Sequence, residues 1–159
     1  MNGLLRGSIV LLGLTTLVVA GCASKKMMMG SGDIVADRQR LMKLNGASWG
    51  DAQAKAKAGN WEGIAVNAET MALNAEHIPM LFPEGSLTEK SKAKPEVWQK
   101  WAEFEAAAKN MVSEAEKLRD AARAKNAQQT EVLMKDFGRK ACGTCHTPFR
   151  VPPPQAPRS

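Results

Sequence analysis

Apolar residues recur along most of the chain at steps of three and four positions, without the strict alternation of a half-buried strand. Residues at these steps fall on one face of an α-helix, so the pattern predicts amphipathic helices. Pro95 suits the first turn of one such helix, where its missing N–H would be unpaired anyway. The most regular series follows it and consists of Trp101, Phe104, Ala108, Met111, Ala115, Leu118 and Ala122.

The same period predicts three further helices, at residues 33–57, 60–78 and 130–149. Asp33 and Asn60 precede the first two as N-caps, because their side chains can accept from backbone N–H groups of the first turn. A loop at 80–94 and a polar link at 124–129 complete the connections. Four amphipathic helices with mostly short links predict an all-α, antiparallel up-down-up-down bundle over residues 33–150.

Alternating helix directions bring distant parts of the chain to one end of this bundle. The first and third helices begin there, and the second and fourth helices end there. At 1.5 Å per residue, Met42 lies about 13 Å in from Asp33. Met71 and Trp101 lie at comparable depth, so these side chains are expected to converge on the end that carries residues 142–150.

Residues 1–21 have the pattern of an export signal. Arg6 supplies a positive charge, and the run 8–20 that follows is apolar. A membrane-spanning helix needs about 20 apolar residues, so this run is too short to span and predicts a secretory signal peptide.

The signal ends in Val-Ala-Gly-Cys at Cys22, which resembles the lipobox of bacterial lipoproteins. It predicts lipidation of Cys22 and a periplasmic, membrane-anchored protein of a Gram-negative bacterium. Ordinary cleavage after Ala23 or Ser24 is the alternative. Residues 22–32 are expected to form a flexible tether, and the proline-rich tail 151–159 is expected to be disordered.

Composition excludes several classes of protein. The chain of 159 residues is 24% charged and 44% hydrophobic, which fits neither a disordered tail nor a polytopic membrane protein. The formal net charge is +6, but no block of five like charges occurs, so a nucleic-acid partner is not expected. Three cysteines are too few for a small disulfide scaffold.

Candidate chemistry lies near the C-terminus, in Cys142-Gly143-Thr144-Cys145-His146. C-x-x-C-H is the signature of covalent haem attachment. On a regular helix, Cys142, Cys145 and His146 share one face, so two thiols can form thioethers with haem vinyl groups while the imidazole binds iron from the proximal side. The motif therefore predicts one covalently bound haem c.

Two cysteines and a histidine at this spacing also occur in proteins without haem. A structural zinc site would need a fourth ligand, and a thioredoxin-like pair expects a βαβ context. A disulfide between Cys142 and Cys145 is the simplest structural alternative. The broadest alternative is a helical lipoprotein without haem that acts as an interaction module.

Several motifs together resemble the class II cytochromes c, meaning cytochrome c′ and its low-spin relatives. The resemblance covers about residues 33–150 and implies a four-helix bundle with haem near one end. The C-terminal position of C-x-x-C-H separates this class from other c-type cytochromes. The remaining marks are Arg38-x-x-x-Met42, Ile78-Pro79-x-Leu81-Phe82-Pro83, Pro95-x-x-Trp98 and Phe149-Arg150.

The resemblance gives Met42 the distal position. In the low-spin branch a methionine binds the iron there, which implies an electron carrier rather than an enzyme. In the cytochrome c′ branch the distal side chain only covers five-coordinate iron, which implies binding of nitric oxide or other small gases. His77 is the rival ligand, and Met71 and Met80 are weaker ones.

The resemblance also implies that Arg38 binds a haem propionate; an exposed arginine paired with Asp37 is the alternative. Pro148 is a departure from the family pattern and predicts that the last helix ends or kinks there. The expected partners are protein redox partners, a membrane through Cys22 and, in the family, a second copy of the chain. A solvated helix face is the favoured explanation of the basic residues Lys135, Arg139, Lys140 and Arg150, and a basic rim near the haem is the alternative.

Overall fold

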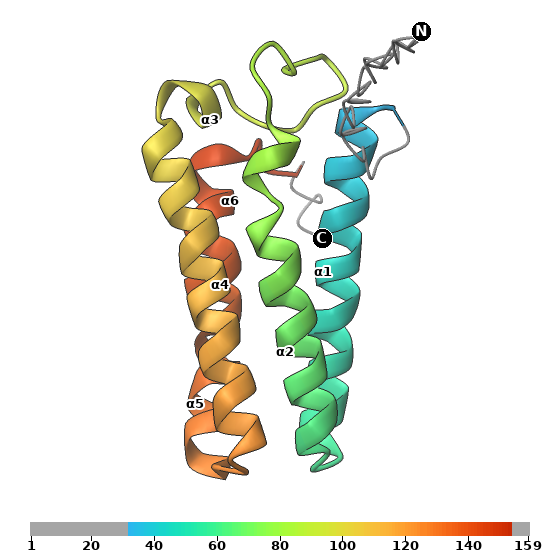
Figure 1. Cartoon of the computed structure of the whole chain (residues 1–159), viewed down its shortest axis with the longest axis vertical. Coiled ribbons are helices and arrows are strands. Elements are labelled where there is room, and N and C mark those ends of the chain that lie inside the picture. Colours follow the sequence, from blue (N-terminus) through green and yellow to red (C-terminus); the bar gives the residue numbers. More distant parts are fainter. Residues whose placement is uncertain (1–31, 154–159) are drawn as a thin grey trace, which may run out of the picture.

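The computed structural model describes residues 32–153, and they form the antiparallel four-helix bundle that the periodicity predicts (Figure 1). Within this range no strand is present. Figure 1 shows the start of α1, the end of α2, the start of α4 and α6 at the same end of the bundle, as predicted. The long helices are α1 (Ile34–Lys57), α2 (Trp61–Glu76), α4 (Trp101–Arg123) and α5 (Ala127–Phe137), the last continuing into α6 (Thr144–Phe149).

The N-terminal predictions lie largely outside the described residues: the signal peptide 1–21, Cys22 and all of the tether except its last residue. Part of the proline-rich tail, residues 154–159, also lies outside them. Among the helices that the structure describes, none has the length and apolar character needed to cross a membrane.

Side-chain caps set the beginnings of the helices. Asp33 Oδ1 accepts from the N–H groups of Val35 and Ala36 at 3.0 and 3.2 Å, which confirms the first predicted cap. Asn60 caps α2 in the same way, as predicted. Asn126 Oδ1 accepts from the N–H of Gln129 at 3.1 Å, and this cap, absent from the prediction, starts α5 at residue 127 rather than 130.

The densest part of the core lies between α2 and α4. The predicted seam of α4 faces α2 and is buried except for the half-buried Trp101. Small side chains on α2 let the two helices approach closely. The fully buried residues of α2 are Ile64, Ala65, Ala68, Met71, Ala72 and Ala75.

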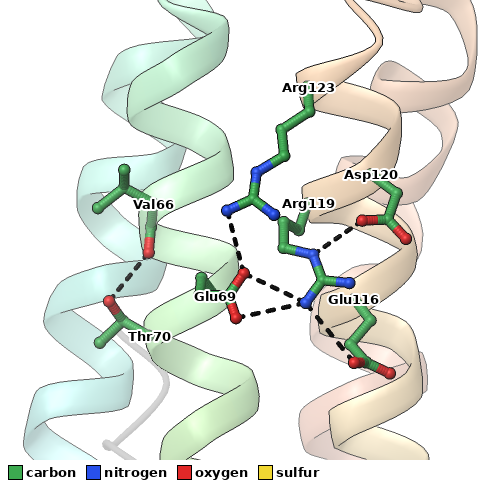
Figure 2. A network of polar contacts seen from close by, with 7 residues as sticks. All are labelled: Val66, Glu69, Thr70, Glu116, Arg119, Asp120 and Arg123. Carbon is green, nitrogen blue, oxygen red and sulfur yellow. Dashed lines mark hydrogen bonds and ion pairs between the residues drawn. The ribbon is translucent and has the colours of Figure 1, made fainter.

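A network of charged side chains joins the same two helices on their outer side (Figure 2). The Glu69 carboxylate of α2 lies 3.2 Å from Arg119 Nη1 and 3.2 Å from Arg123 Nη2 of α4. Arg119 also contacts Glu116 and Asp120 on its own helix. The network therefore links α2 to α4 in addition to their apolar contact.

Helix α1 is packed less completely against protein atoms. Its only fully buried apolar side chains are Val35 and Ala52. Trp49 stacks on Phe137 of α5, with ring centroids 4.7 Å apart. This stack joins α1 to α5.

The third predicted helix differs from the observed structure. A single helix from Pro95 onward was expected, but α3 (Glu96–Gln99) is separated from α4 by Lys100, whose φ of −125° and ψ of 48° are not helical. Trp98 Nε1 donates to the carbonyl oxygens of Phe82 and Pro83 at 3.0 and 3.1 Å. These contacts turn α3 toward the preceding loop and account for the break.

The fourth predicted helix is interrupted by a π-helical segment, η2 (Gly138–Gly143). Here the Lys140 carbonyl oxygen accepts from Asn110 Nδ2 of α4 and from Thr144 Oγ1, both at 2.6 Å. A carbonyl oxygen has two lone pairs, so these side chains occupy the acceptor that a regular α-helix would use. The regular helix predicted for this stretch was therefore wrong in its middle.

Candidate functional site

A cavity of about 470 Å³ opens at the end of the bundle that carries the C-x-x-C-H motif. It brings together residues of α1, α3, α4 and α6, of the turn after α2 and of the loop before α3. Phe104 lies at its inner wall and contacts Phe82 and Phe149, with ring centroids 4.8 and 5.4 Å away. The other apolar lining residues are Val35, Met42, Ile78, Ala93 and Val97.

Helix α6 supplies Cys145 and His146 to this cavity, whereas Cys142 lies in η2 and does not line it. Both thiols are free, so the disulfide alternative is not what the structure shows. Burial raises the pKa of Cys142, and burial together with the neighbouring Cys142 raises the pKa of Cys145 to about 11. Both thiols are therefore protonated at neutral pH.

His146 is half-buried in the same wall. Burial, and secondarily the positive charge of Arg150, lower its pKa below the usual range. The imidazole is therefore neutral at neutral pH and keeps a nitrogen lone pair for a metal ion.

Met42 lines the cavity from α1 and is partly buried against the core. None of its predicted rivals lines this cavity. His77 is an exposed C-cap whose Nδ1 lies 2.7 Å from the Leu73 carbonyl oxygen, Met71 is buried in the core, and Met80 is 71% exposed. Among residues 32–153, Met42 is therefore the sole methionine that lines this cavity.

Arg38 is buried, with 6% of its surface exposed, so the alternative of an exposed arginine paired with Asp37 is wrong. Asp37 instead binds Arg40 at 2.6 Å. The Arg38 guanidinium lies over the Phe82 ring, 4.2 Å from its centroid. Burial lowers the pKa of Arg38, but an arginine remains charged in proteins.

Residues of the loop 79–91 accept four hydrogen bonds from the Arg38 guanidinium. Nε donates to the Leu81 carbonyl oxygen at 2.6 Å, and Nη1 donates to the Ser86 carbonyl oxygen and to Ser91 Oγ at 3.1 and 3.4 Å. Nη2 donates to Ser86 Oγ. Since a guanidinium has five N–H donors, one N–H of Nη2 is left for a carboxylate.

The end of α6 is hydrogen-bonded to the segment 92–94 that follows this loop. The N–H of Lys94 donates to the Phe149 carbonyl oxygen at 2.9 Å, and the N–H of Val151 donates to the Lys92 carbonyl oxygen at 2.8 Å. The helix ends one residue after Pro148, as predicted, and Arg150 is extended. Arg150 lines the cavity from this position.

Of the four residues considered for a basic rim, only Arg150 lines the cavity. Lys43 and Lys92 line it together with Arg38 and Arg150. The neighbourhood of Met42 on α1 could have pointed to Lys43, but Lys92 lies in a loop without periodicity. Lys135, Arg139 and Lys140 do not line the cavity, so the alternative of a basic rim has no support from them.

These residues fit a haem group. Haem c needs two thiols, a neutral imidazole and apolar walls, and its propionates need cationic neighbours. One thiol (Cys145), the imidazole, the apolar walls and the cations line the cavity, and the second thiol, Cys142, lies in the adjoining η2. By contrast, no three His, Cys, Asp or Glu side chains of residues 32–153 gather closely enough to hold a bare metal ion, so the zinc alternative has no support there.

Comparisons with known proteins agree with this geometry. The family model described as Cytochrome C′ matches residues 33–150. Cytochrome c-556 of Agrobacterium fabrum is 30% identical over 141 residues, covering 87% of this chain and 94% of that protein. Cytochrome c′ of Pararhodospirillum photometricum is 37% identical over 87 residues, covering 54% of this chain and 69% of that protein.

The fold is similar to the crystal structure of cytochrome c′ from Rubrivivax gelatinosus. The TM-score is 0.64 at 26% sequence identity, over 75% of this chain and 95% of that one. The cofactor of such proteins is covalently attached haem c, and Cys142 and Cys145 fit the attachment motif. The chain therefore belongs to the cytochrome c′ family, the class II cytochromes c.

Proposed function

We propose that this protein carries single electrons between redox partners and that His146 and Met42 are the two axial ligands of its haem iron. The observation that supports this most is the shared cavity: Met42 reaches it from α1 and His146 from α6. A neutral imidazole and a thioether are the axial pair that raises the reduction potential of a c-type haem. A carrier of this kind transforms no substrate, so we infer that it is not an enzyme.

Each surrounding residue has a role in this proposal. Cys142 and Cys145 hold the haem by thioether bonds, and the one N–H of Arg38 left over from the loop binds a propionate. Phe104 and its aromatic neighbours exclude water and lower the local dielectric. When bound, the haem supplies the one-electron couple between ferric and ferrous iron.

The absorption spectrum of the holoprotein tests this assignment. The wild-type protein is expected to be low spin, with the charge-transfer band of sulfur ligation. Met42→Ala should convert it to a high-spin spectrum, because no other methionine of the described part of the chain lines the cavity. Met80→Ala is the matched control, since Met80 is 71% exposed and its removal should leave the spectrum unchanged. An unchanged spectrum in Met42→Ala would show that Met42 only packs.

Five-coordinate haem that binds nitric oxide is the second candidate. It is supported by the matching family model, which is that of Cytochrome C′. In that case the wild-type ferrous protein is high spin and takes up carbon monoxide or nitric oxide directly. If Met42 is a ligand, only the Met42→Ala variant should bind carbon monoxide readily.

We also propose export to the periplasm and anchoring through a lipid on Cys22, on the strength of the signal and lipobox residues. A Cys22→Ser variant should move from the membrane fraction to the soluble periplasmic fraction in a Gram-negative host. Equal membrane retention of both forms would contradict the anchor.

A homodimer is a further proposal, supported by exposed apolar side chains on the first two helices. Leu44 of α1 and Val66 and Leu73 of α2 are each about half exposed, at 51%, 53% and 52%. An interface over this part of α1 and α2 would remove these apolar side chains from water. Light scattering of the purified holoprotein should give twice the monomer mass, and Leu73→Glu should return it to the monomer mass.

A further inference from the structure

The polar residues that line the cavity are unusual in charge. Four of them are cations and none is a carboxylate: Arg38, Lys43, Lys92 and Arg150. Arg38 is buried and committed to the loop, whereas the other three are exposed. The opening of the cavity is therefore surrounded by exposed positive charge, and these three residues are called the cationic mouth below.

The cations of the mouth also lack local partners. Neither Lys43, Lys92 nor Arg150 has an Asp or Glu oxygen within 4.0 Å among the residues that the structure describes. Elsewhere on the bundle eight lysines and arginines are ion-paired, for example Arg119 with Glu69 and Arg139 with Asp136. Unpaired charge of one sign beside an opening raises the local concentration of oppositely charged molecules.

The cofactor itself does not account for all of this charge. A haem has two propionate groups, and the lining residues supply four cations, one of which already faces inward. Glu84 and Glu89 lie in the neighbouring loop and are exposed, but neither lines the cavity. A positive surplus therefore remains at the mouth once a haem is in place.

The same end of the bundle also exposes apolar side chains. Met80, Leu87 and Val151 are 71%, 43% and 45% exposed. Protein interfaces combine apolar contacts of this kind with a polar rim. An interfacial helix that binds a membrane carries cations and apolar residues on opposite faces of one element. Here the cations come from three places, α1, the loop and the end of α6, so the mouth is not a surface of that kind.

We propose that the cationic mouth is the docking surface for an acidic protein partner, which approaches the haem at this opening. The proposal rests on the proposed electron-carrier function and names the chemistry of the partner. Complementary charge chiefly raises the rate of encounter and fixes orientation. Docking at the mouth would bring the partner close to the haem with which it exchanges an electron.

The test uses the holoprotein without its lipid anchor, as the Cys22→Ser variant, and a redox-inert paramagnetic anion, hexacyanochromate(III). Amide NMR signals of residues near Lys43, Lys92 and Arg150 should broaden first as the anion is added. Lys43→Glu and Lys92→Glu should each weaken its binding by about threefold to tenfold. Poly-L-glutamate should compete with the anion, and its binding should weaken in the same variants.

Lys57→Glu is the matched control, because it makes the same change of charge on the same helix, α1. Residue 57 lies 14 positions from Lys43, or about 21 Å along the helix. That distance exceeds the Debye length of about 8 Å at physiological ionic strength. Binding should therefore be unchanged in Lys57→Glu, and an equal loss in both variants would show that only net charge matters.

Two further results would overturn the proposal. The first is binding to phosphatidylglycerol vesicles that Lys43→Glu abolishes while poly-L-glutamate does not bind, which would make the mouth a membrane contact. The second is a changed haem spectrum in both Lys43→Glu and Lys92→Glu, which would show that these lysines serve the cofactor. Since the anion exchanges no electron, its binding is read independently of whether Met42 ligates iron or the protein carries electrons.

Discussion

At the scale of single residues, Arg38 connects α1 to the loop that covers the open end of the bundle. It donates to the backbone or side chain of Leu81, Ser86 and Ser91 and lies over the Phe82 ring. A buried charge is tolerated only when its hydrogen bonds are satisfied, and the loop satisfies four of five donors. Arg38 thus organises the loop as well as facing the cavity.

We predict that Arg38→Gln lowers the free energy of unfolding of the holoprotein by about 3 kcal/mol, since the buried guanidinium is lost and the partly buried loop carbonyls lose charged donors. Arg139→Gln should cost less than about 1 kcal/mol, because that arginine is 74% exposed and its ion pair is a surface pair. Denaturant titration followed by circular dichroism measures both. Equal costs for the two variants would contradict the role of Arg38 in holding the loop.

The attachment motif and its histidine could be identified from local sequence, because C-x-x-C-H is contiguous and its chemistry depends on spacing alone. The surroundings of Arg38 could not, since its partners lie 43 to 53 positions away in a loop without periodicity. The same holds for Trp49, whose stacking partner Phe137 is on another helix. Contacts of this kind depend on tertiary packing and leave no local pattern.

At the scale of secondary structure, η2 is the element most closely tied to the site, because it carries Cys142. Segments of π-helix are rare and occur often at functional sites. Asn110 of α4 and Thr144 both donate to the Lys140 carbonyl oxygen inside η2. These two side chains thereby set the register of Cys142 relative to Cys145 and His146.

We predict that Asn110→Ala loosens η2, because its carbonyl loses a donor from α4. Hydrogen exchange of the amides in residues 138–145 should become faster by roughly five- to tenfold, corresponding to about 1 kcal/mol. Lys109→Ala is the control, since Lys109 is the exposed neighbour on the same helix. Unchanged exchange in Asn110→Ala would show that η2 is stable without this hydrogen bond.

The ion-pair network between α2 and α4 is the basis of a second prediction at this scale. A double-mutant cycle of Glu69→Gln and Arg119→Gln should give a coupling energy of about 1 kcal/mol, because both side chains are partly shielded and share a network (Figure 2). The pair Glu114 and Lys117 lies within one helix and should give about 0.3 kcal/mol. Added salt should reduce the larger coupling, and a coupling no greater than that of the control pair would contradict the network.

Helix existence and most boundaries follow from periodicity and capping, as Asp33 and Asn60 illustrate. The break at Lys100 does not, because it depends on the indole of Trp98 reaching two loop carbonyls. The π-helical turn depends in the same way on Asn110 from another helix. Local propensity decides where helices form, and tertiary hydrogen bonds decide where they are interrupted.

At the scale of the whole molecule, the bundle is packed unevenly around the cavity. Helices α2 and α4 bury six and eight side chains, whereas α1 buries only two apolar ones. The partly buried apolar residues of α1 include Leu41, Met42 and Trp49, and Met42 faces the cavity. The haem is therefore expected to complete the packing of α1.

The energetic scale supports this expectation. A dry cavity of about 470 Å³ would cost up to about 11 kcal/mol at 24 cal/mol per Å³. Domains of this size have a total stability of about 5–15 kcal/mol. A haem-free chain therefore has to admit water to the cavity or let α1 move toward α6.

We predict that the Cys142→Ser/Cys145→Ser double variant, purified without haem, keeps its α2–α4 pair and loses much of the protection of α1. Hydrogen exchange followed by mass spectrometry should show amides of residues 38–50 exchanging at least about a hundredfold faster than in the holoprotein. Amides in residues 64–75 and 104–118 should exchange slowly in both forms, because these residues depend on the cavity less than residues 38–50 do. Equal protection of α1 and α4 in the haem-free variant would show that protein contacts alone hold α1. The bundle would then fold completely without haem, and the haem would not be part of its core.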